Sequence, residues 1–203
     1  MLDVDDLIPS LQQAFSASPG ELSELHGRLA AAAQRDGVLD VAYRTVDSPV
    51  GQLLLAATDA GLVRVAFDSE NHDAVLQLLA DRISPRILSA RSRLDIPARQ
   101  LDEYFDRRRQ RFDLPLDWQL SAGFRRAVLS HLPDIGYGHT ASYAAVAQLA
   151  GNPKAVRAAA SACATNPLPV VVPCHRVIYS DGRPGRYRGG EEAKLTLLTL
   201  EAS

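Results

Sequence analysis

Cys174 and His175 are neighbours in the last part of the chain, and together they could carry out nucleophilic chemistry. A cysteine is a strong nucleophile only as the thiolate, so its ordinary pKa of about 8.5 must be lowered or a base must take its proton. Histidine can be that base near neutral pH. Adjacent side chains of an extended chain point apart, so a direct contact is not assured, and a water molecule could connect them. By itself, such a pair is more often structural than reactive.

A helix with one small, basic face is expected over residues 153–164, with Asn152 as its cap and Pro153 in its first turn. Its apolar face carries Val156, Ala159, Ala160 and Cys163. The opposite face carries Lys154, Arg157, Ala158 and Ser161. Small side chains let a helix lie close to another surface, and Arg157 could reach further. An ordinary amphipathic helix with a solvated arginine explains the same pattern, and Cys163 is expected to be an inert core residue.

The elements around these residues are mainly helical. Helices are expected over residues 124–132 and 143–150, the second capped by Ser142. A tight turn at Gly151 then leads into the helix at 153–164, which makes a helix-turn-helix. Residues 170–172 are expected to be a buried extended run before Cys174. A glycine-rich loop over 182–190 and a closing helix over 195–200 complete this part.

The earlier part of the chain changes its periodicity twice. Residues 1–37 favour two helices, one around Leu7 to Phe15 and one that Ser18 caps and Asp36-Gly37 ends. Alternating and apolar runs then predict three strands, and later apolar spacings predict two helices. The strands are expected over residues 41–46, 52–58 and 62–67, and the helices over 72–83 and 97–109. This is an α+β domain built on a small antiparallel sheet.

We therefore expect three parts: a helical extension over 1–37, an α+β domain over 38–116 and a helix-turn-helix domain over 117–203. The net charge of −2 conceals an uneven distribution, because residues 117–203 hold nine Lys and Arg against six Asp and Glu. A basic, DNA-binding patch is plausible only in that part. The composition, with 46% hydrophobic and 23% charged residues, is typical of a soluble globular protein.

The two cysteines, Cys163 and Cys174, argue against a disulfide scaffold and favour a reducing compartment. No run of about 18 apolar residues could cross a membrane. The acidic start of the chain is unlike a secretion signal, so a cytoplasmic location is expected. The scattered histidines and the lack of zinc-site spacing predict no metal.

The segment from Asn166 to Ile178 reads Asn-Pro-Leu-Pro-Val-Val-Val-Pro-Cys-His-Arg-Val-Ile. It resembles the active-site signature of the O6-alkylguanine-DNA alkyltransferases, whose core is Pro-Cys-His-Arg-Val. Other segments are similar to that family's helix-turn-helix, substrate-pocket loop and closing helix, and they occur in the same order: residues 140–143 with 149–158, 185–190 and 194–201. The likeness extends over about residues 43–201 and is dense in the C-terminal half. Several motifs in one order are far more specific than any one of them.

The resemblance implies a catalytic role for each matching residue. Cys174 would accept the alkyl group, His175 would act through water as its base, and Glu201 would orient the histidine. Asn166 would hold the active-site turn. Tyr143 would donate a proton to the departing guanine.

The resemblance also assigns residues to DNA and to the damaged base. A base inside a duplex cannot present its O6 group to a thiol, so it must be flipped out. Arg157 would fill the space that it leaves, and Lys154, Ala158 and Ser161 would contact the DNA. The family places this helix in the minor groove, where contacts carry little sequence information. The flipped base would be held by Tyr187, Val177, Gly185, Arg188 and Gly189.

The implied folds are RNase H-like for the sheet domain and winged helix-turn-helix-like for the C-terminal domain. The implied activity is a single-turnover methyltransferase that moves a methyl or larger alkyl group irreversibly from O6-alkylguanine in double-stranded DNA to Cys174. Activity on O4-alkylthymine and cooperativity along DNA are left open. A monomer without cofactor or membrane attachment is expected. Gly136 and Ala160 depart from the family's usual proline and glycine, which affects the expected DNA affinity rather than the chemistry.

Two other classes of function would account for parts of this sequence. A lesion-binding module of the same fold would recognise alkylated bases without repairing them, but such relatives lack the acceptor cysteine. A helix-turn-helix regulator without chemistry would leave three features unexplained: the Pro-Cys-His-Arg motif, Tyr143 and the glycine-rich loop.

Overall fold

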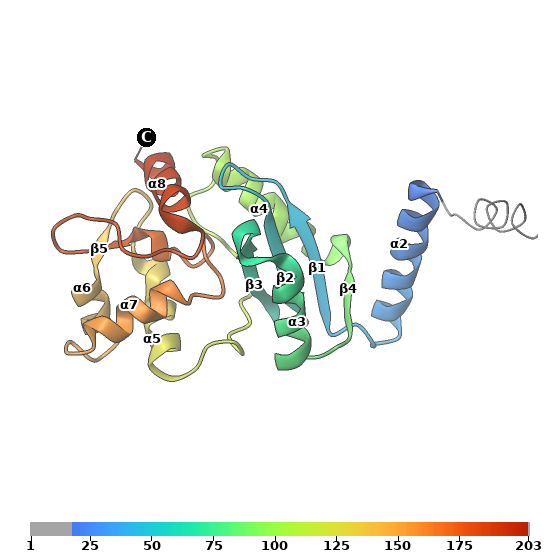
Figure 1. The fold of residues 1–203 in the computed structure, drawn as a ribbon, viewed down its shortest axis with the longest axis horizontal. Helices are drawn as coiled ribbons and strands as arrows, with labels where there is room; N and C mark the ends of the chain where they lie inside the picture. Colours follow the sequence, from blue (N-terminus) through green and yellow to red (C-terminus); the bar gives the residue numbers. More distant parts are fainter. Residues whose placement is uncertain (1–17, 203) are drawn as a thin grey trace, which may run out of the picture. The chain divides into compact units, whose positions relative to one another are not determined.

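The computed structural model describes residues 18–202, apart from the side chains of Pro19 and Ser23 (Figure 1). They divide into two compact units, one ending at Leu39 and one beginning at Asp40. The first unit contains helix α2, Pro19–Arg35. The Ser18 hydroxyl accepts from the Glu21 amide and the Glu21 carboxylate accepts from the Ser18 amide, so the expected cap is confirmed. The other expected helix, around Leu7 to Phe15, lies outside the described residues.

A four-stranded sheet forms the start of the second unit, in the order β3-β2-β1-β4. Its strands are β1 (Val41–Val46), β2 (Leu53–Thr58), β3 (Gly61–Phe67) and β4 (Ile87–Ser89). The first three pair antiparallel, as expected. Strand β4 was not expected, and it pairs parallel with β1, so the sheet is mixed rather than antiparallel. Three residues are too few to show a strand periodicity, which is why the sequence conceals it.

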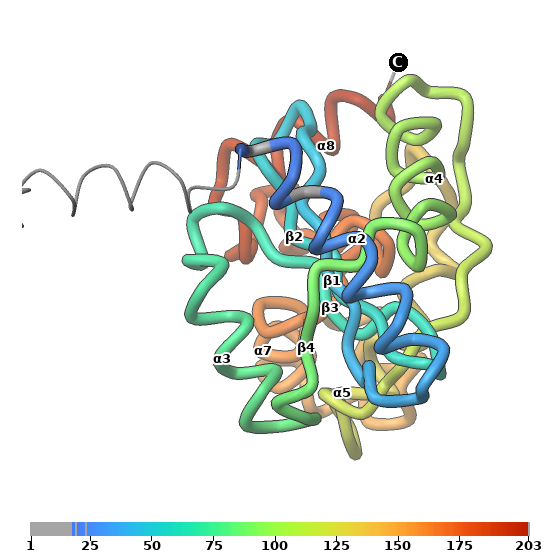
Figure 2. The backbone as a smooth tube through the Cα atoms, turned by 90° about the vertical axis from the view of Figure 1, so that its right-hand side faces the viewer, coloured from blue at the N-terminus to red at the C-terminus, as the bar shows by residue number. Residues whose placement is uncertain are grey.

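Helices cover both faces of this sheet: α3 (His72–Arg82) and α4 (Asp95–Phe105) lie on opposite sides of the strands (Figure 2). Leu79 of α3 packs with Leu54, Ala56 and Val63 of the sheet. Strands β2 and β3 are buried almost throughout, which fits their apolar composition. Short 3-10 turns, η1 (Asp68–Glu70) and η2 (Arg91–Leu94), precede the two helices.

The C-terminal half is mainly helical, as expected. Its helices are α5 (Gly123–His131), α6 (Tyr143–Leu149), α7 (Val156–Ala164) and α8 (Gly190–Glu201). Helices α5, α6 and α7 pack against one another. The short strands β5 (Ala141–Ser142) and β6 (Val177–Ile178) pair parallel beside them. Two 3-10 turns, η3 (Leu132–Asp134) and η4 (Cys174–Arg176), complete the half.

Three local expectations were wrong. Helix α7 begins at Val156, so Lys154 lies in the preceding turn. The valines before Cys174 are buried, but they form a turn in which Val170 has a φ of 70° rather than an extended run. Cys174 and His175 then begin the 3-10 turn η4, so the alternation of an extended chain does not apply to them.

Strand β3 supports this region from the sheet side. The Val65 amide donates to the Pro167 carbonyl over 2.9 Å, and an Arg64 Nη1 donates to the same oxygen over 3.1 Å. The turn that precedes Cys174 is therefore fixed to the edge of the sheet.

Within residues 18–202, every helix is too short or too polar to cross a membrane.

Candidate active site

Cys174 lies in η4 with only 1% of its surface exposed. Its Sγ accepts a hydrogen bond from Asn166 Nδ2 at 3.1 Å. The same nitrogen donates to the Val172 carbonyl at 2.8 Å, and Asn166 Oδ1 accepts from the Leu168 amide at 2.9 Å. Asn166 thus ties both ends of the turn together and places a donor on the thiol.

Burial raises the pKa of the Cys174 thiol to about 11, although the Asn166 hydrogen bond and the positive charge of Lys194 lower it. A thiol with this pKa is protonated at neutral pH. Its reaction therefore requires a base that removes the proton as the new bond forms.

His175 is fully buried, and its Nε2 lies 2.8 Å from Glu201 Oε1. Burial lowers the pKa of His175, against the opposing effect of Glu201, so the ring is neutral near pH 7. A neutral ring next to a carboxylate carries its proton on Nε2 and donates it to Glu201. His175 Nδ1 is then a lone-pair acceptor, and it has no hydrogen-bond partner among residues 18–202.

Glu201 is held in place by more groups than sequence analysis assigned. Arg176 donates to its two oxygens from Nε and Nη2, both at 2.9 Å, and Tyr104 Oη donates to Oε1 at 2.6 Å. The Gly138 amide donates at 3.3 Å. Burial raises the pKa of Glu201, but hydrogen bonds from His175 and Arg176 outweigh it and lower the pKa to about 2. Glu201 is therefore ionised throughout the physiological range.

Lys194 is a buried charged residue whose structural role was not expected from the sequence. It is fully buried, and its Nζ donates to the carbonyls of Val177 at 2.7 Å and Gly185 at 3.3 Å. It joins the strand after Cys174 to the glycine-rich loop. Lys194 and Glu201 lie seven residues apart on the buried side of α8. Charged residues at core spacing on an otherwise apolar helix face are the signal that could have revealed Lys194.

Tyr143, the first residue of α6, lies beside a cavity of about 260 Å³ that Arg157, Ala160 and Tyr179 also line. Burial raises the pKa of Tyr143, so its phenol keeps its proton. Gly185 passes so close to the Tyr143 hydroxyl that a Cβ at this position would collide with it. The structure thus brings three expected residues together: Tyr143, Arg157 and Gly185.

The outer face of α7 is exposed as expected. Arg157, Ala158 and Ser161 are exposed, while Ala159, Ala162 and Cys163 are buried. Ala160 is only partly buried and lines the cavity with Arg157, so its expected place on the core face was wrong. Lys154 is exposed in the turn before the helix.

The aromatic residue of the glycine-rich loop packs against one ring of β3 and against the ring of His175. Tyr187 is buried, with its ring 5.5 Å from that of Phe67 and 6.3 Å from that of His175. A Cβ on Gly189 would come within 2.6 Å of the Phe67 ring. Val177 is buried in β6. Arg188 points elsewhere, to an ion pair with Glu70, and does not line the cavity beside Tyr143.

Comparison with known families covers most of the chain. Residues 41–118 match the ribonuclease-like domain of 6-O-methylguanine DNA methyltransferase, and residues 123–203 match the DNA binding domain of the same family. The chain belongs to the 6-O-methylguanine DNA methyltransferase family. The expected family and the ribonuclease-like character of the sheet domain are thereby confirmed.

Relatives of this methyltransferase chain match nearly their whole length. It is 38% identical over 161 residues to the methylated-DNA–protein-cysteine methyltransferase of Mycolicibacterium paratuberculosis, covering 79% of the chain and 92% of the relative. It is 35% identical over 163 residues to the constitutive enzyme of Bacillus subtilis, covering 78% and 94%. A crystal structure of Mycobacterium tuberculosis OGT in complex with DNA has a TM-score of 0.67 at 33% identity, over 79% of this chain and 92% of that one.

Among residues 18–202 of this methyltransferase, no group of three or more His, Cys, Asp and Glu side chains is arranged to hold a metal ion.

Proposed function

We propose that this protein repairs DNA by transferring a methyl or larger alkyl group from O6-alkylguanine to Cys174. The observation that carries the proposal is the buried thiol itself, which accepts a hydrogen bond from Asn166 beside a His175–Glu201 pair. Membership of the methyltransferase family supports the same reaction. DNA is the partner, and the damaged guanine is proposed to enter the protein flipped out of the duplex.

The proposed transfer moves one alkyl group and two protons. The Cys174 proton passes through a water molecule to His175 Nδ1, whose lone pair is free because Nε2 carries its proton toward Glu201. The sulfur attacks the alkyl carbon, the C–S bond forms and the C–O6 bond breaks. The departing guanine takes negative charge, and the Tyr143 phenol is proposed to donate the proton that neutralises it.

The product at Cys174 is a thioether, which hydrolysis does not reverse under ordinary conditions. The protein's other cysteine, Cys163, is buried, and burial strongly raises its pKa. It is a poor nucleophile for removing the alkyl group. Each molecule is therefore expected to react once.

Incubation with an oligonucleotide that contains O6-methylguanine is expected to add one methyl group per protein molecule. Intact-mass measurement should show a single added methyl, and a peptide map should place it on the peptide that contains Cys174. With excess oligonucleotide, the extent of reaction should stop at one equivalent. Tight lesion binding with an unmodified Cys174 would instead support a lesion-binding module.

Arg157→Ala is expected to slow repair of duplex DNA, because Arg157 is proposed to occupy the space left by the flipped base. Flipping a base costs a few kcal/mol, so the loss should be about tenfold or more. The rate with free O6-methylguanine should stay nearly unchanged, since no duplex has to be opened. Arg126→Ala, an exposed arginine on α5, is the control for the loss of one charge. Equal losses on duplex and free base would refute the proposed role.

Further proposals concern organisation. We propose the three-part division at 1–37, 38–116 and 117–203, which the family matches at 41–118 and 123–203 support. A monomer in a reducing compartment such as the cytoplasm is proposed, consistent with two unpaired cysteines.

The base pocket is proposed to use Tyr187, Val177, Gly185 and Gly189. Arg188 is proposed to contribute through the backbone of the loop rather than through its side chain.

A further inference from the structure

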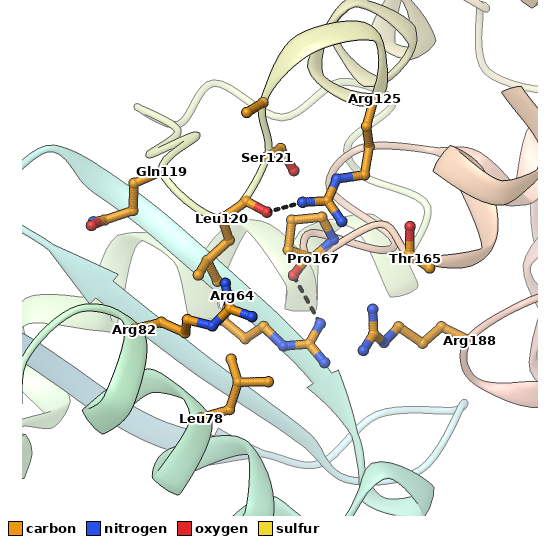
Figure 3. A pocket seen from close by; sticks show the side chains of 11 residues that line it. Arg64, Leu78, Arg82, Gln119, Leu120, Ser121, Arg125, Thr165, Pro167 and Arg188 are labelled. Atoms are coloured by element: carbon orange, nitrogen blue, oxygen red, sulfur yellow. Dashed lines mark hydrogen bonds between the residues drawn. The ribbon is translucent and has the colours of Figure 1, made fainter. Parts of the chain in front are cut away.

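A second cavity, of about 470 Å³, lies on the sheet side of the turn before Cys174 (Figure 3). Four arginine side chains reach it from separate elements. Arg64 comes from β3, Arg82 from the end of α3, Arg125 from the first turn of α5 and Arg188 from the glycine-rich loop. We call this cavity the arginine pocket. It is separate from the cavity beside Tyr143 and Arg157.

The positive charge of the arginine pocket is poorly balanced. Arg64 and Arg188 share one carboxylate, that of Glu70. Arg125 donates to the Leu120 carbonyl, which carries no formal charge. The Arg82 guanidinium forms no hydrogen bond or ion pair with residues 18–202. Four guanidinium groups therefore face one cavity with a single carboxylate between them.

The depth of Arg64 makes this imbalance unusual. Arg64 is only 3% exposed, so water cannot screen its charge as it screens that of a surface arginine. Burial lowers the pKa of Arg64, and the nearby charge of Arg188 lowers it further. An anion in the cavity would relieve this repulsion.

Two neutral donors on the opposite wall fit the same ligand. Ser121 lines the pocket at 4% exposure, and its hydroxyl has no hydrogen-bond partner among residues 18–202. A buried hydroxyl without a partner is unfavourable unless a ligand satisfies it. Helix α5 begins two residues later with Ala122 as its N-cap, so no side chain covers the amides of its first turn. Such a helix start favours an anion.

We propose that the arginine pocket binds a phosphate group, either of the DNA backbone or of a free phosphate compound. Guanidinium groups, a hydroxyl and helix amides are the donors that phosphate oxygens accept from. The site does not depend on alkyl transfer. It is connected to the reaction centre, however, because Arg64 donates to the Pro167 carbonyl and the preceding residue, Asn166, donates to Cys174 Sγ.

The test uses the full chain and inorganic phosphate at constant ionic strength, with chloride as the reference anion. Phosphate should raise the Tm of the wild type relative to chloride, because a ligand that binds only the folded state stabilises it. In the double variant Arg82→Gln/Arg125→Gln, phosphate affinity should fall at least tenfold. These two arginines form no ion pair within the described residues, so the double variant should fold. If it does not, Arg82→Gln alone, at an exposed position, replaces it in the test. Arg126→Gln on α5, which does not line the pocket, is the matched control.

A second arm identifies the source of the phosphate. Binding to undamaged duplexes of increasing length is measured against salt concentration. If the DNA backbone is the source, the double variant should lose affinity for long duplexes. The slope of its log affinity against log salt concentration should also decrease, by the equivalent of about one to two phosphate contacts. If a free compound is the source, inorganic phosphate should bind while DNA affinity stays equal to that of Arg126→Gln. Equal Tm in phosphate and chloride, together with unchanged DNA affinity in the double variant, would overturn the proposal. Methylation of Cys174, followed by mass on the same samples, reports separately on alkyl transfer.

Discussion

Cys174→Ala is expected to abolish alkyl transfer completely while leaving DNA binding intact. The thiol is the only proposed acceptor, and no neighbouring group can replace it. Its removal leaves the exposed face of α7 unchanged, since Arg157 and Ser161 are exposed while Cys174 is buried. Mass analysis after incubation with O6-methylguanine DNA should show unmodified protein, and a gel-shift assay should show wild-type affinity for the lesion.

Cys163→Ala is the matched control for Cys174→Ala. Both cysteines are buried, but Cys163 lies on the core face of α7. This variant should therefore keep full, single transfer to Cys174. If Cys174→Ala also lost DNA binding, the thiol would have a structural role and the proposed division between binding and chemistry would fail.

Glu201→Ala is expected to destabilise the protein and to impair repair at the same time. The alanine leaves Arg176 buried without its carboxylate, and breaking a buried ion pair in this way costs about 3–5 kcal/mol. His175 also loses the acceptor that keeps its proton on Nε2. Removal of an orienting carboxylate lowers the rate of a catalytic triad by about 10⁴-fold, so a loss of at least about a hundredfold is expected here. Urea unfolding and single-turnover rates measure the two effects.

The pH dependence of the free energy of unfolding distinguishes the effect of the Glu201 charge from the effect of its packing. Hydrogen bonds from His175 and Arg176 lower the pKa of Glu201 from its ordinary 4.5 to about 2. Its stabilising effect is therefore fully present above about pH 4.5 and is lost as the pH falls toward 2. The difference in the free energy of unfolding between the wild type and Glu201→Gln should narrow over this range. Glu191→Gln, an exposed glutamate on α8, should show no such narrowing. A difference that stayed constant with pH would mean that packing, not charge, dominates.

Local signals in the sequence were sufficient for most of the fold. The Ser18 cap, the three antiparallel strands and the cap at Ser142 depend on neighbouring residues, so periodicity and cap chemistry predict them. The Cys174–His175 pair was specific because a long motif surrounds it. The structure places Asn166 within hydrogen-bond distance of Cys174, and Glu201 within hydrogen-bond distance of His175.

What the sequence did not predict depends on contacts between distant segments. Tyr104 lies in a helix for which no chemical role was expected, yet it donates to Glu201, 97 positions later. Arg188 was expected to line the base pocket, but Glu70, 118 positions earlier, attracts its side chain. Neither partner can be identified from spacing. Strand β4 and the turn at Val170 were not predicted for a different reason. The strand is too short to show a periodicity, and the strained backbone at Val170 follows no sequence pattern.

Strand β3 carries none of the proposed catalytic or base-pocket residues, but it supports two segments that do. Its Val65 amide holds the turn before Cys174, and its last residue, Phe67, packs against Tyr187 and Gly189 of the glycine-rich loop. Substitutions in this strand would move the thiol and the loop together. A genetic screen for loss of repair would therefore recover β3 variants alongside true active-site variants.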